Sequence, residues 1–198
     1  MTLPGRPAAA RGGPAAGLRV IKVGPGEHYV TGAPGEAIST TLGSCVAACI
    51  RDPVARVGGL NHFMLPRSTD GTWGKAMASL RYGNFAMEQL INDILVRGGQ
   101  KARLEVKVFG GGRLTLDQAG IGEGNATYVE AYLAAEGMLP LIAELRGSVA
   151  RKLLYIPVEG RVFMQELSTA TGRIAATETR FERTLPHRLS IGEAELFG

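Results

Sequence analysis

The chain has 198 residues, of which 45% are hydrophobic, and its 22 basic against 18 acidic side chains leave a formal charge of +4. This composition suits one ordinary domain with a sizeable core, and the small excess of positive charge, scattered along the chain, does not predict a nucleic-acid partner. No apolar run approaches the roughly 18 residues of a membrane span, and prolines and glycines interrupt the N-terminus where a signal peptide needs a continuous apolar core. We therefore expect a cytoplasmic protein with no membrane insertion.

The first expected segment is a disordered leader, because residues 1–17 are rich in Ala, Gly and Pro. Branched residues then predict strands at 18–23 and 27–32. Two short apolar runs, 45–51 and 57–65, flank the turn opener Asp-Pro and predict a β-hairpin.

The clearest helix is expected over 84–97, where Phe85, Leu90, Ile91, Ile94 and Leu95 recur close to a 3.6-residue period. Asn84 is its expected cap, and Gly98-Gly99 its expected end. Further elements are predicted as a strand at 104–110, a helix at 122–136, a strand at 138–145 and a second hairpin at 153–167. Beyond about residue 168 the chain is polar, and its order is left open. The fold class is α+β, or a layered α/β domain.

Cys45 and His62 lie on opposite arms of the first predicted hairpin. A two-residue loop of Pro53 and Val54 would oppose them directly, but such loops prefer φ > 0 at both positions, which proline forbids. A four-residue loop over 53–56 makes the pair diagonal, with Cβ atoms about 7–8 Å apart. Both registers place the two side chains on one face of the sheet.

A thiol and an imidazole on one face could form a nucleophile and its base. A free thiol, with a pKa near about 8.5, is mostly protonated at neutral pH, and a neighbouring imidazole can take its proton. The imidazole needs an acceptor for its second nitrogen, for which Ser39, Thr40 and Thr41 all offer hydroxyls. The backbone N–H groups of Gly43 and Ser44 could form an oxyanion hole.

Each of these residues also has a purely structural interpretation. Cysteine in an apolar strand is usually a small core residue, and packing explains Cys49 better than a role as a resolving thiol. A zinc site of Cys45, Cys49 and His62 has no fourth ligand in the sequence. The glycine triplet 110–112 lacks the GK[ST] ending of a phosphate loop and predicts a loop or a tight packing site. Two cysteines without a disulfide framework favour a reducing compartment.

The segment TTLGSCVAACIRDPVARVGGLNHFMLP resembles the signature of CheD, the chemoreceptor glutamine deamidase family of bacterial and archaeal chemotaxis. The resemblance continues through LRYGNFAMEQLINDILVRGG, KVFGGG, IGEGN and EGRVFMQEL. It spans roughly residues 18–167, which predicts a deamidase domain there and leaves 168–198 as a C-terminal extension. It implies packed β-sheets flanked by two or three helices, similar to the catalytic domain of cytotoxic necrotizing factor toxins.

The resemblance also implies a reaction, hydrolysis of selected receptor glutamines to glutamate with release of ammonia, and no metal or organic cofactor. Carried onto this chain, Cys45 forms a thioester with the substrate, and His62 activates the thiol and protonates the departing ammonia. The family's histidine-orienting threonine falls by position on Ser39, with Thr40 and Thr41 following. The implied partners are chemoreceptor cytoplasmic helices and, in some members, a CheC-type phosphatase. The alternative function is a deamidase-like module that acts by docking alone.

Overall fold

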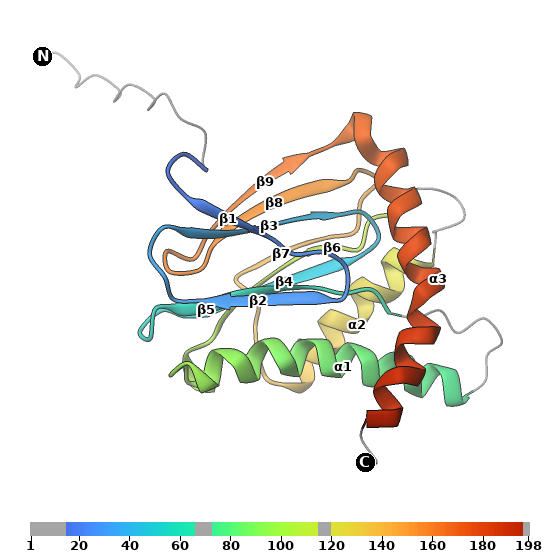
Figure 1. The fold of residues 1–198 in the computed structure, drawn as a ribbon, viewed down its shortest axis with the longest axis horizontal. Coiled ribbons are helices and arrows are strands. Elements are labelled where there is room, and N and C mark those ends of the chain that lie inside the picture. The colour runs from blue at the N-terminus through green and yellow to red at the C-terminus, as the bar shows by residue number, and fades with distance from the viewer. Residues whose placement is uncertain (1–14, 66–72, 115–119, 196–198) are drawn as a thin grey trace, which may run out of the picture.

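Two β-sheets lie face to face, and two helices cover the outer face of one of them (Figure 1). This computed structural model describes residues 15–65, 73–114 and 120–195. At residues 73–79, 169, 171 and 186–195 it describes the backbone but not the side chains. The strands are β1 (Arg19–Lys22), β2 (Glu27–Thr31), β3 (Glu36–Leu42), β4 (Val46–Asp52), β5 (Val57–His62), β6 (Glu105–Gly110), β7 (Ile142–Leu145), β8 (Arg151–Ile156) and β9 (Arg161–Glu166). The helices are α1 (Trp73–Val96), α2 (Ile121–Ala135) and α3 (Thr171–Glu195), with short 3-10 turns at Lys101–Arg103 and Ser168–Ala170.

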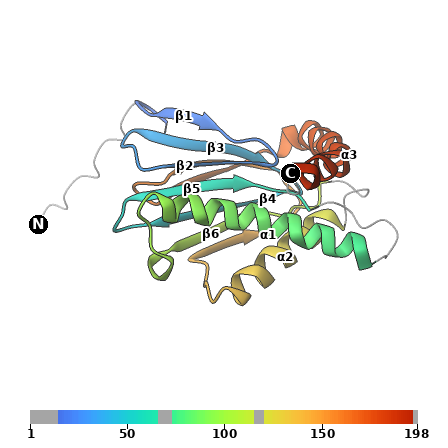
Figure 2. The same ribbon diagram turned by 60° about the horizontal axis from the view of Figure 1, so that its bottom comes forward.

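Both sheets are mixed. One has the strand order β1-β3-β8-β9 and the other the order β2-β5-β4-β6-β7. β1 runs parallel to β3 and β7 runs parallel to β6, whereas the other neighbours are antiparallel. α1 and α2 pack on the five-stranded sheet, and α3 crosses one end of the molecule (Figure 2). The predicted class, packed sheets flanked by helices, is confirmed.

β4 shows how one strand serves two core layers. Successive side chains of a strand point to opposite faces, so Val46, Ala48 and Ile50 join the core beneath α1 and α2. Ala47 and Cys49 join the core between the two sheets. A strand covered on both faces needs a continuous apolar run rather than an alternating one. The sequence of β4 has this run.

The turn between β4 and β5 has the longer of the two loops considered from the sequence. Asp52 pairs with Val57, which leaves the four residues 53–56 as the loop. Oδ1 of Asp52 accepts hydrogen bonds from the N–H groups of Val54 and Ala55, at 2.8 and 3.0 Å. The four-residue register and the capping aspartate are both confirmed.

The start predicted for α1 is wrong. The helix begins at Trp73 rather than at Asn84, because the good helix formers of KAMASL extend it upstream. Asn84 instead accepts a hydrogen bond from the Tyr128 hydroxyl at 2.8 Å. Phe85, predicted on the core face, is 58% exposed. The helical period places it opposite the residues that α1 does bury, which are Met87, Leu90, Ile91 and Ile94.

The C-terminal extension, whose order the sequence left open, folds into a 3-10 turn followed by α3. Ala175 and Leu185 of this helix are buried, and Leu185 joins the core between the sheets. The expected leader falls mostly outside the described residues, which begin at residue 15.

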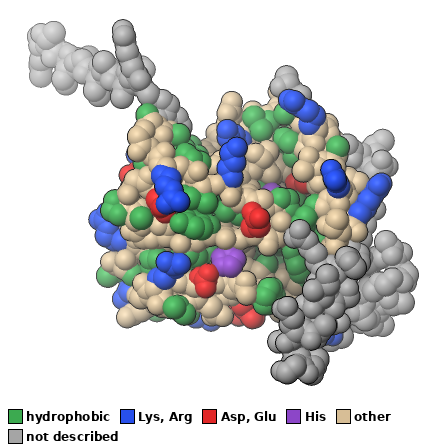
Figure 3. All heavy atoms as spheres, in the orientation of Figure 1, with side chains coloured by type: hydrophobic (Ala, Val, Ile, Leu, Met, Phe, Trp, Pro, Cys, Tyr) green, Lys and Arg blue, Asp and Glu red, His purple; other side chains and the backbone are tan. Residues whose placement is uncertain are grey.

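Charged side chains are dispersed over the face of the molecule that Figure 3 shows. In the view of Figure 3, Lys and Arg side chains are spread among apolar, acidic and other groups and form no single large patch on that face. Among the described residues, no helix combines the length and the apolar character needed to cross a bilayer.

Candidate active site

The loop that joins β3 to β4, residues 43–45, has its three carbonyl groups held from one side. The first and third carbonyls accept the N–H groups of Gly112 and Gly111, each at 2.8 Å, and the middle one accepts Asn125 Nδ2 at 2.8 Å. Gly110 has φ +109°, and a Cβ there would meet the third carbonyl oxygen. The glycine triplet is therefore a packing element, as predicted, and it braces this loop.

The N–H groups of the same loop converge on one carboxylate. Oε1 of Glu178 accepts the N–H of Gly43 at 2.8 Å and that of Cys45 at 3.2 Å. Oε2 accepts both the N–H and the hydroxyl of Ser44, at 2.6 and 2.7 Å. Glu178 belongs to α3 and is 2% exposed. Successive N–H groups that point to one spot form a concavity that binds anions.

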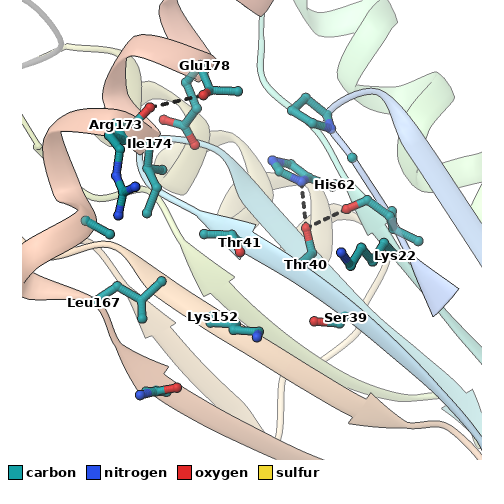
Figure 4. A pocket seen from close by; sticks show the side chains of 16 residues that line it. Lys22, Ser39, Thr40, Thr41, His62, Lys152, Leu167, Arg173, Ile174 and Glu178 are labelled. Atoms are coloured by element: carbon teal, nitrogen blue, oxygen red, sulfur yellow. Dashed lines mark hydrogen bonds between the residues drawn. The ribbon is translucent and has the colours of Figure 1, made fainter. Parts of the chain in front are cut away.

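His62 is oriented by Thr40. Oγ1 of Thr40 lies 2.7 Å from Nδ1 of His62 and donates its proton to the Val23 carbonyl at 2.8 Å (Figure 4). A hydroxyl has one proton, so Oγ1 must accept from an N–H at Nδ1. This network assigns the tautomer in which Nε2 has the lone pair. Nε2 is buried and has no hydrogen-bond partner among the described residues.

The structure brings Cys45 and His62 together, and Glu178 joins them. Sγ of Cys45, one ring nitrogen of His62 and one carboxylate oxygen of Glu178 all lie within 4.8 Å of one another. Because Thr40 engages Nδ1, Nε2 is the nitrogen left for the thiol. Burial, followed by the negative charge of Glu178, raises the pKa of the Cys45 thiol well above its usual range. Burial lowers the pKa of the His62 imidazole. Both shifts favour the neutral form of the group.

Of the three upstream hydroxyls, Ser39 occupies the position of the family's histidine-orienting threonine, but it does not contact His62. Ser39 donates to the Leu153 carbonyl at 2.9 Å, on the neighbouring strand β8, and Thr40 is the residue that contacts His62. The alternation of β3 explains the difference, because Ser39 and Thr41 share one face of the strand and Thr40 lies on the other.

A cavity of about 670 Å³ lies beside these residues, between α3 and β3. In Figure 4, α3 borders one side of it, and Thr40 and His62 point toward each other on the other side. Glu178 and His62 line the cavity, whereas Cys45 is fully buried. The lining also includes three basic side chains, Lys22, Lys152 and Arg173.

Comparison with known proteins identifies the family. A family model described as CheD chemotactic sensory transduction matches residues 64–166. The chain is 52% identical over 178 residues to a probable chemoreceptor glutamine deamidase CheD of Rhodopseudomonas palustris (strain BisA53), covering 89% of this chain and 84% of that protein. This chain belongs to the CheD family. Its CheD relatives, each described as a probable chemoreceptor glutamine deamidase, also include that of Hydrogenovibrio crunogenus, 41% identical over 93% of this chain and 97% of the relative. The CheD protein of Hahella chejuensis is 39% identical, over 91% and 86%.

The CheD-family model match begins at Met64, after both Cys45 and His62. The alignments to the CheD relatives are longer, and one that covers 93% of the chain necessarily includes both residues.

Cys49 differs from Cys45 although both are free and buried. Cys49 packs in the core between the sheets, and burial raises the pKa of its thiol well above the usual range. Among the described residues, the candidate metal ligands that lie together are Cys45, His62 and Glu178, so Cys49 is not part of that cluster.

Two residues at this candidate site had no predicted role. Asn125 lies in the IGEGN segment, where its carboxamide also accepts the Leu65 N–H at 2.8 Å and so ties α2 to the chain after β5. Glu178 lies in the extension whose order was left open. The signal that could have found it is the helical spacing of Ala175, Glu178 and Leu185, which places all three on one face.

Proposed function

We propose that this chain is a cysteine-dependent protein-glutamine amidohydrolase, which converts selected glutamines in the cytoplasmic helices of chemoreceptors to glutamate and ammonia. One observation supports the proposal most strongly: the Cys45 thiol lies within 4.8 Å of a ring nitrogen of His62, in a loop whose N–H donors bind a carboxylate. The relatives' descriptions name chemoreceptor glutamine as the group that they deamidate. Residues 18–167 form the deamidase domain in this proposal, and residues 168–198 are an extension to it.

The first half of the reaction forms a thioester. Nε2 of His62 takes the proton from Sγ of Cys45, and the thiolate attacks the carboxamide carbon of the substrate. The oxygen of the tetrahedral intermediate becomes negatively charged and accepts the N–H groups that now bind Glu178. His62 returns the proton to the nitrogen, the C–N bond breaks, and ammonia leaves.

The second half of the reaction restores the thiol. Nε2 of His62 takes a proton from water, and the resulting hydroxide attacks the thioester carbon. The C–S bond breaks, and the proton on His62 returns to Sγ of Cys45. The net change is the addition of water to a primary amide, giving a carboxylate and ammonium.

Thr40 supports both halves of the reaction. By accepting the Nδ1 proton, it keeps the lone pair on Nε2 and holds the ring toward Sγ. Its own proton goes to the Val23 carbonyl, and this dipole favours the imidazolium that forms in each half. Thr40 is thus a positioning residue that acts through His62.

The test is mass spectrometry of receptor cytoplasmic fragments incubated with the protein. We expect the mass gain of a glutamine-to-glutamate conversion with wild-type protein and none with Cys45→Ala. The matched control is Cys49→Ala, which removes the other buried thiol of the same core and should leave conversion intact. Equal conversion by wild type and Cys45→Ala would refute the proposal.

The alternative is a docking module that tunes receptors, or a CheC-type phosphatase, without chemistry. It predicts that Cys45→Ala leaves the chemotactic response intact. An active nucleophile, base and anion-binding loop are of no use to such a module, so we favour the enzyme. We place the reaction in the cytoplasm, where both free thiols stay reduced and receptor cytoplasmic helices are accessible.

A further inference from the structure

The position of Glu178 is that of a reaction product. Its side chain ends in the group that deamidation of glutamine generates, a γ-carboxylate, and this group lies beside the nucleophile Cys45. Four donors from residues 43–45 engage its two oxygens, at 2.6 to 3.2 Å. A product glutamate still bound after its thioester is hydrolysed would present the same group to the same donors.

These contacts favour an anion at this position rather than a metal ion. Cys45, His62 and Glu178 are close enough to hold a cation. However, each oxygen of Glu178 already accepts two N–H or O–H bonds, which uses the lone pairs that a cation would need. The cluster therefore fits a bound carboxylate.

The helix that delivers Glu178 is anchored to the body of the protein on either side of it. Ala175, one turn earlier, is 4% exposed, and Leu185, two turns later, is fully buried. Phe181 packs on the core between the sheets, next to Gly26. α3 thus packs on the body of the protein through these residues and places one of its carboxylates at the thiol.

We propose that α3 is a built-in mimic of the product, occupying the groove into which a substrate helix docks, with Glu178 in the place of the side chain to be deamidated. This inference rests on the proposed function. A receptor helix must displace α3 to reach Cys45, which is fully buried while Glu178 is in place.

The variant Glu178→Gln tests this inference directly, because it turns the product mimic into a substrate. The thiolate of Cys45 attacks the new carboxamide carbon, ammonia leaves with the proton from His62, and water cleaves the thioester. The wild-type carboxylate is regenerated at position 178. This conversion is intramolecular, so its rate is independent of protein concentration.

The measurement is the mass of the peptide containing position 178 in full-length Glu178→Gln. We expect the carboxamide to be lost in this variant and retained in the double variant that also has Cys45→Ala. Ala176→Gln is the matched control, because position 176 is an exposed site on the same helix, two residues away, and its carboxamide should persist.

The outcomes separate this inference from the function on which it rests. If receptor fragments are deamidated while the carboxamide of Glu178→Gln survives, α3 is no mimic, although the proposed function stands. If the carboxamide at 178 is converted while receptor fragments are not, the mimic stands and the receptor substrate is wrong. If Cys45-containing protein converts neither, both proposals fall.

A second variant, Glu178→Ala, checks the displacement step in the full-length chain. Losing hydrogen bonds to a charged group should raise the rate of Cys45 alkylation by iodoacetamide by about tenfold or more. Cys49, buried in the core between the sheets, serves as an internal control whose alkylation should not change. An unchanged alkylation rate at Cys45 would show that Glu178 does not close the site.

Discussion

The two ends of the β4–β5 hairpin each bind a buried carboxylate through backbone N–H groups, but they do so in different ways. At the turn, Asp52 accepts N–H groups of its own hairpin, and Oδ2 binds Arg103 at 2.6 and 2.9 Å. At the open end, Glu178 comes from a helix far away in the sequence and binds the loop before β4. The first carboxylate belongs to the hairpin itself, whereas the second belongs to α3, which a substrate helix displaces in our proposal. In our proposal, therefore, the turn stabilises the fold and the open end exchanges ligands.

The largest effect should follow from removing the base at the open end. His62→Ala should lower the rate of ammonia release from receptor fragments by about 10³-fold, because a positioned general base contributes on that order. The matched control is His28→Ala, since His28 contacts Asp93 at the surface at 2.7 Å and lies away from the thiol. Equal losses of activity in His62→Ala and His28→Ala would contradict the catalytic role that we assign to the open end of the hairpin.

At the turn, Asp52→Asn should affect stability and leave catalysis alone. The change leaves Arg103 without its carboxylate and weakens the hydrogen bonds around a fully buried Asp52 side chain, which should lower the free energy of unfolding by about 3 kcal/mol. This is the low end of the range for buried pairs, because the Arg103 side chain is 30% exposed. Urea unfolding measures the loss. Ammonia release per folded molecule should match wild type, and a large loss there would remove the distinction between the two ends.

Thr40→Val should have a smaller effect on the rate of ammonia release, measured per folded molecule. Losing the acceptor at Nδ1 frees the imidazole to adopt the wrong tautomer, which should lower kcat by about 10- to 100-fold with little change in KM. Thr41→Val is the control, because Thr41 lies on the opposite face of β3. Rescue by Thr40→Ser, which keeps the hydroxyl, would identify positioning as the cause. An equal fall in kcat in Thr40→Val and Thr40→Ser would contradict this positioning role.

The smallest expected effect is that of acid on the difference in free energy of unfolding between wild type and Asp52→Asn, at the turn. Hydrogen bonds from Arg103, followed by those from backbone N–H groups, hold the pKa of Asp52 well below its usual range in the folded protein. A carboxyl with a lowered folded pKa stabilises the fold above its unfolded pKa of about 3.9, and this contribution is lost as pH falls further. The stability gap between wild type and Asp52→Asn should therefore be constant above about pH 5 and narrow below about pH 4. Urea unfolding at a series of pH values measures it.

Local patterns in the sequence predicted most of this architecture. The hairpin and its four-residue loop followed from Asp52, Pro53 and two short apolar runs, and the shared face of Cys45 and His62 followed from that register. Errors arose where a pattern was ambiguous. Phe85 fits a 3.6-residue period loosely, and the helix formers upstream of Asn84 extend α1 without any periodic apolar signal.

The carboxylate at the thiol could not be predicted in the same way. Glu178 reaches Cys45 across more than a hundred residues, and no local rule connects a polar helix with a loop before a distant strand. The choice between Ser39 and Thr40 likewise depended on which face of β3 points to His62. Alternation fixes that choice only after one residue of the strand has been placed. Contacts of this kind depend on tertiary structure.

The brace behind residues 43–45 has a consequence for measurement in solution. With their carbonyls tied to Gly111, Gly112 and Asn125, these peptide groups cannot flip when α3 departs, so the vacated loop keeps its attraction for negative charge. Small carboxylates such as acetate or free glutamate therefore compete for the same spot. Assay buffers should be chosen without them.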